Sequence, residues 1–89
     1  MDSASLQARI QHEVAELRTL HPQIALCRTT LDEWTERGQA RYALRLDIRW
    51  TGHQSLVSGP AKDEVNAALR AAFDAARAAL ITGSERKSA

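Results

Sequence analysis

The sequence predicts an α+β domain in which two helices pack on one face of a three-stranded antiparallel sheet, in the order α-β-β-β-α. Apolar residues recur every three or four positions near both ends of the chain, which is typical of amphipathic helices. Between these ends, residues 41–50 alternate polar and apolar side chains, which is typical of a strand with one buried face. A chain of 89 residues is long enough for one domain. We expect its ordered core at about residues 4–82 and a frayed tail at 83–89.

The first helix is predicted from a stripe of aliphatic residues spaced by four, four and three positions. Its members are Leu6, Ile10, Val14 and Leu17. Ser3 or Ser5 can cap its start, because a short hydroxyl accepts a free N–H of the first turn. Glu13 lies four residues after Arg9, one helical turn away, so the two side chains can form an ion pair. Pro22 ends the helix, since the residue before a proline is pushed out of the α region.

The first two strands are predicted to form a hairpin. Residues 24–31 are rich in β-branched and apolar side chains, but their alternation is imperfect, so we expect a β-bulge. Residues 32–39 are polar and contain Gly38, so they are predicted to be the hairpin loop. The second strand directs its apolar residues to the core. These inward residues are Tyr42, Leu44, Leu46, Ile48 and Trp50.

A turn at Gly52 leads to a short third strand, residues 54–58, with Leu56 and Val57 available to the core. Asp63 can cap the second helix, which is rich in alanine and therefore favours helix intrinsically. Its buried stripe is predicted to be Val65, Leu69, Ala72, Phe73, Ala76 and Leu80. Gly83 is expected to end it as the residue after the C-cap.

Composition excludes several classes of protein. The net charge is only +1, so the chain is not a polycation, although ten of its twelve basic residues are arginine. No stretch approaches the roughly 20 apolar residues of a membrane span. Residues 1–7 lack the basic-then-apolar order of a signal peptide, so we expect a cytoplasmic protein. Cys27, the single cysteine, cannot form an internal disulfide.

The pattern of elements resembles two RNA-associated families. The order α-β-β-β-α is similar to that of double-stranded RNA-binding domains. The spaced aliphatics of the first helix, the strand 42–48, the Gly52 turn and the acidic-x-x-Ala-Ala-Leu run at 64–69 resemble the ribosome hibernation-promoting factor family, also called sigma-54 modulation proteins. This resemblance covers about residues 5–81. The family's first strand has no counterpart here.

The resemblance implies a ribosome-associated factor that inhibits translation. Such a factor binds rRNA on the small subunit through a basic sheet face and blocks the mRNA/tRNA channel. The alternative is a protein-interaction module that does not bind RNA. Without the family's first strand, residues 24–31 would be an open, fairly apolar edge, at which two chains could pair as a two-fold homodimer.

Four arginines are the candidate RNA-binding residues. Arg41, Arg45 and Arg49 project from the outer face of the central strand, about 13 Å apart per step, and Arg28 joins them from the neighbouring strand. Arginines on such a face can contact phosphates, which supply most sequence-independent affinity for RNA. The competing interpretation is a solvated sheet face whose charges pair across strands.

Other candidates point away from catalysis. Arg70 and Arg77 can both pair with Asp74 on a solvated helix face. Trp34 is either an anchor for a partner or folds back onto the sheet. The carboxylates Asp32, Glu33 and Glu36 are interpreted as part of a solvated turn. The three histidines and Cys27 lack the spacing of metal ligands. With no phosphate loop and no nucleophile–base pair, we expect no enzyme, no metal and no cofactor.

Overall fold

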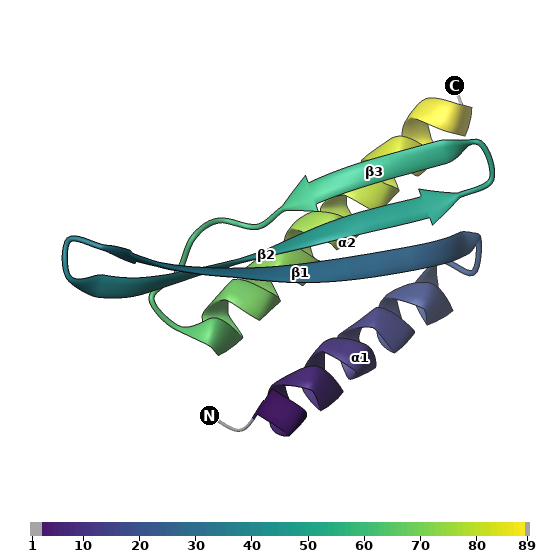
Figure 1. The fold of residues 1–89 in the computed structure, drawn as a ribbon. Coiled ribbons are helices and arrows are strands. Elements are labelled where there is room, and N and C mark those ends of the chain that lie inside the picture. The colour runs from purple at the N-terminus through teal and green to yellow at the C-terminus, as the bar shows by residue number, and fades with distance from the viewer. Residues whose placement is uncertain (1–2, 89) are drawn as a thin grey trace.

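The computed structural model describes the backbone of residues 3–88 and the side chains of residues 4–81 (Figure 1). Its elements follow the predicted order α-β-β-β-α. They are α1 (Ser3–Leu20), β1 (Ile24–Glu36), β2 (Gln39–Trp50), β3 (His53–Ser58) and α2 (Val65–Ser88). The predicted α+β class is therefore confirmed.

The three strands form one antiparallel sheet in the order β1-β2-β3, and both helices cover the same face of it (Figure 1). That face carries the core. Its buried cluster is Leu17, Ile24, Leu44, Leu46, Ile48, Val57, Leu69, Ala72, Phe73, Ala76 and Leu80. The remaining aliphatics of the α1 stripe are half-buried and pack against this cluster. The alternation along β2 and the spacing of three or four residues along the two helices therefore identified the buried faces of these elements correctly.

The hairpin between β1 and β2 is longer than predicted, and the loop assigned to residues 32–39 is wrong. β1 continues to Glu36, and only Arg37 and Gly38 make the turn. Both turn residues have positive φ angles, 51° and 79°, as a two-residue turn between twisted strands requires. The side chains near this turn, including that of Trp34, are exposed. The polar residues there belong to strands that are exposed on both faces, and not to a loop.

The predicted bulge in β1 is confirmed by a register shift between Ile24 and Leu26. It places Ile24 and Cys27 on the inner face and leaves Leu26 exposed on the outer one. The prediction for Leu56 is wrong. Leu56 pairs with Asp47, so it lies on the outer face and is 74% exposed, while its neighbour Val57 is buried.

The predicted end of the last helix at Gly83 is also wrong, because α2 continues to Ser88. One glycine inside a helix costs only about 1 kcal/mol relative to alanine, so it does not by itself end the helix. The side chains of residues 82–89 lie outside the described residues, and the frayed tail at 83–89 stays a prediction.

Candidate functional site

The outer face of the sheet is covered by neither helix (Figure 1). The strand register shows which residues share this face, because residues paired across an antiparallel ladder point the same way. They are Leu26, Arg28, Thr30, Asp32, Trp34 and Glu36 on β1, Gln39, Arg41, Ala43, Arg45, Asp47 and Arg49 on β2, and Gln54, Leu56 and Ser58 on β3. We call this set the outer face. It contains all four predicted arginines, which outnumber its three carboxylates by one.

Two of these arginines are held by carboxylates of the same face. Arg45 donates from Nε to Asp32 Oδ2 at 2.8 Å and from Nη2 to Asp32 Oδ1 at 3.3 Å. Arg49 makes the corresponding pair of bonds to Asp47, at 3.3 and 3.1 Å. Both guanidinium side chains remain more than half exposed, at 56% and 53%. They form the cross-strand and same-strand ion pairs of a solvated sheet, yet stay open to a ligand from outside.

Asp47 is the carboxylate with the most donors on this face. It accepts a hydrogen bond from Gln54 Nε2 at 3.0 Å in addition to those from Arg49. The hydrogen bond from Gln54 and those from Arg49, with the charges of Arg49 and Arg28, hold the pKa of the Asp47 carboxyl below its ordinary value. Asp47 therefore stays ionised and fixes Arg49 in place.

Arg41 is less available than its neighbours on β2. It lies nearer the hairpin turn, and its side chain is only 31% exposed. Its Nε is 3.6 Å from Glu36 Oε2, an ion pair without a hydrogen bond, and this buried nitrogen has no hydrogen-bond partner among the described residues. Trp34, its cross-strand neighbour, is 39% exposed and lies on a strand, so the loop position predicted for it is wrong.

Arg28 is the arginine of the outer face that makes no ion pair with a described residue. Its charge acts on Asp47, its cross-strand neighbour, without direct contact. The fold brings Arg28 and Arg45 to one shallow hollow of about 290 Å³. The hydroxyl residues Thr30 and Ser58, the carboxylate of Asp47 and the exposed Leu56 line the same hollow. No sequence signal marked the two hydroxyls, because their position follows only from strand register.

Other kinds of site find less support. Among the described residues, no three histidine, cysteine or acidic side chains lie close enough to hold a metal ion. Cys27 is half-buried, and its burial raises the pKa of the thiol, which disfavours a reactive thiolate. No helix in the described part of the chain is both long enough and apolar enough to span a membrane.

Comparison with known proteins returns no match. No protein-family model, no curated protein and no solved structure matches this chain.

Proposed function

We propose that the chain binds the phosphate backbone of RNA through its outer face, as a ribosome-associated factor that inhibits translation on the small subunit. The observation that carries the proposal is the hollow shared by Arg28 and Arg45. Two guanidinium groups and two hydroxyls around one concave surface match the donors that phosphate oxygens accept. The ribosome as target rests on the resemblance to hibernation-promoting factors.

Two arginines and one carboxylate, that of Asp47, line the hollow, so its net positive charge favours an incoming phosphate. Arg28 has no ion pair with a described residue to break, and Arg45 can share its remaining N–H donors while it stays bound to Asp32. Contacts to phosphate carry no sequence information, so binding through these arginines is expected to be independent of sequence. A factor of this kind acts by occupancy, blocking the channel that mRNA and tRNA would fill.

The affinity should depend moderately on salt. If the outer face neutralises two or three phosphates, binding should weaken roughly 10- to 40-fold between 50 and 200 mM salt, from counterion release. A polycationic RNA binder would show a steeper dependence. The salt slope therefore reports how many arginines take part.

Co-sedimentation with small ribosomal subunits tests the proposal. The double variant Arg28→Glu/Arg45→Glu should lose binding, because it puts two carboxylates in the hollow. The matched control is Arg18→Glu/Lys62→Glu, which changes the net charge equally at exposed positions away from the outer face. The control should sediment like the unmodified chain. If Arg28→Glu/Arg45→Glu sediments with the subunits as well as the control does, the outer face is excluded as the site.

A homodimer through β1 is the second candidate, because the outer column of this edge strand is self-complementary. No described strand pairs with β1 on the side away from β2. A two-fold antiparallel pairing centred on Thr30 places Arg28 opposite Asp32 of the second copy. It also places the two exposed apolar residues, Leu26 and Trp34, opposite each other. Such pairing would bury a 13-residue edge.

The dimer ranks second because α1 projects past β1 on the side away from β2, where a second copy would have to fit (Figure 1). Charge swapping tests it. R28D and D32R each place like charges opposite one another and should be monomeric. Mixing the two variants restores both opposite-charge pairs and should restore the dimer mass in light scattering. A monomeric mass for the unmodified chain at high micromolar concentration would refute this candidate.

A further inference from the structure

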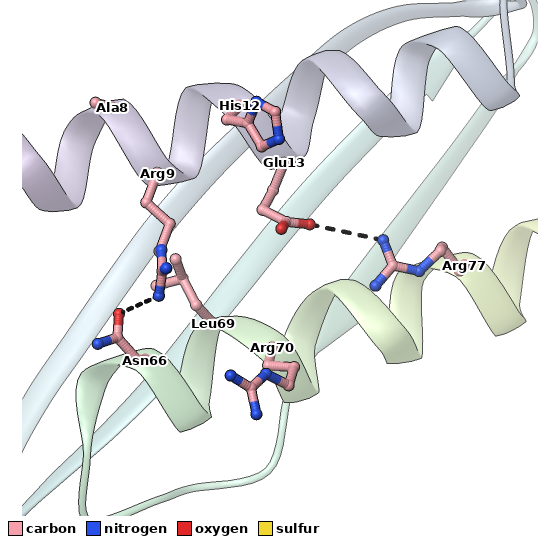
Figure 2. A pocket seen from close by; sticks show the side chains of 8 residues that line it. All are labelled: Ala8, Arg9, His12, Glu13, Asn66, Leu69, Arg70 and Arg77. Atoms are coloured by element: carbon pink, nitrogen blue, oxygen red, sulfur yellow. Dashed lines mark hydrogen bonds and ion pairs between the residues drawn. The ribbon is translucent and has the colours of Figure 1, made fainter.

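A second concave surface lies between the two helices, on the opposite side of the sheet from the outer face (Figure 2). Its volume is about 520 Å³, within the range of small-molecule sites. Three arginines, a histidine, an asparagine and one carboxylate, Glu13, surround it, and Leu69, which is buried, forms part of its lining. We call it the interhelix groove.

One end of this groove holds two arginines, Arg9 and Arg70, that form no ion pair with a described residue. Arg9 reaches across from α1 and donates Nη1 to Asn66 Oδ1 at 3.0 Å (Figure 2). The predicted pairing of Arg9 with Glu13 does not form, because Glu13 pairs with Arg77 instead. Arg70 lies one turn beyond Asn66 on α2 and makes no ion pair with a described residue. A neutral amide thus stands beside two guanidinium groups.

The other end of the groove is close to neutral. Arg77 pairs with Glu13 at 3.7 Å and with Asp74 at 2.7 Å (Figure 2 shows the first pair). Of the two pairings predicted for Asp74, the structure contains the one with Arg77. His12 Nε2 lies 3.2 Å from Oε1 of Glu16, so a carboxylate stands beside this imidazole as well. The groove is therefore asymmetric, with its positive charge at the Arg9 and Arg70 end.

We propose that the interhelix groove binds a small organic phosphate of nucleotide size. The phosphate lies between Arg9 and Arg70, and the organic part lies over Leu69 toward Arg77. Two guanidinium groups suit a dianionic phosphomonoester, because each offers planar, paired donors. The Asn66 amide, whose oxygen accepts from Arg9, has its N–H donors left for a phosphate oxygen. The site does not depend on RNA binding by the outer face.

Backbone amide NMR with adenosine monophosphate as the probe tests this site. Saturable shifts are expected in residues 8–13 and 66–77. Inorganic phosphate, which has the charge without the organic part, should cause weaker shifts at the Arg9 and Arg70 end. Adenosine, which has no phosphate, should cause no saturable shifts in either range. The variant Arg9→Gln/Arg70→Gln keeps much of both side-chain stems and should weaken binding about tenfold or more, through loss of charge-assisted hydrogen bonds. The control Arg45→Gln on the outer face should leave adenosine monophosphate binding unchanged.

Each other outcome would overturn the proposal. Absence of saturable shifts at millimolar adenosine monophosphate would show that the groove is not a phosphate site. Equal binding by Arg9→Gln/Arg70→Gln, with an unchanged melting temperature, would place the phosphate elsewhere. Groove shifts with single-stranded RNA but none with the mononucleotide would make the groove part of an RNA surface. Ribosome co-sedimentation of Arg9→Gln/Arg70→Gln, expected to be unchanged, separates this test from that of the outer face.

Discussion

Gly59 follows β3 and packs against α2, where the absence of a side chain sets how closely the helix approaches. A Cβ at this position would lie 2.7 Å from both Cα and Cβ of Ala72 and 3.0 Å from its backbone nitrogen. Carbon atoms in contact prefer about 3.5–4.0 Å, so α2 would have to retreat by about 1 Å. Gly59 cannot move away freely, because its N–H donates to the carbonyl of Leu44 at 3.0 Å.

Gly59→Ala is therefore expected to lower the free energy of unfolding by about 3 kcal/mol, at the upper end of the usual range for overpacking. The upper end applies because two of the three atoms in the way belong to helix backbone and not to a flexible side chain. In a domain of this size, such a loss lowers the melting temperature by roughly 12–24 °C. Circular dichroism melts and urea denaturation measure both quantities.

Two further variants make the test specific. Gly52→Ala introduces a Cβ with no atom within 4 Å, so it should cost only the strain of a positive φ, about 1–2 kcal/mol. Adding Ala72→Gly to Gly59→Ala removes one clashing atom but leaves two backbone atoms, so stability should not return. If Gly59→Ala melts within a few degrees of the unmodified chain, the reasoning about close approach is wrong.

Three further predictions follow from burial and charge. Leu17→Ala should lower the free energy of unfolding by about 2–5 kcal/mol in urea denaturation, because Leu17 is fully buried, whereas Leu20→Ala at a 63% exposed position should change it by under about 0.5 kcal/mol. Asp47→Asn should reduce the loss of stability on acidification. The hydrogen bond from Gln54 lowers the pKa of Asp47 in the folded state. This carboxylate therefore stabilises the fold at pH values above its unfolded pKa, and the stabilisation is lost as the pH falls through the folded pKa. Parallel acid titration curves for the variant and the unmodified chain would contradict this. Burial raises the pKa of Cys27, so iodoacetamide should alkylate it more slowly at neutral pH than a cysteine in an unfolded peptide, and equal rates would contradict the burial.

The sequence was most informative where a pattern is local to one element. The alternation along β2 predicted which side chains face the core and which arginines face outward, because successive residues of any strand point to opposite faces. It was least informative where one pattern fits two structures. Residues 32–36 are polar both as a loop and as a strand exposed on its two faces, and only pairing with β2 distinguishes them. Leu56 and Val57 are both apolar, so the strand register had to decide which one is buried.

Periodicity and composition by themselves determined the order of the elements and the buried faces, since these depend on neighbours a few positions apart. Only the tertiary structure decided the partners of the charged groups. Arg9 pairs with Asn66, 57 residues away, and not with Glu13 one helical turn away. Arg28 and Arg45 meet at one hollow because β1 and β2 pair in one particular register. Such contacts depend on how whole helices and strands are placed relative to one another, which no local pattern encodes.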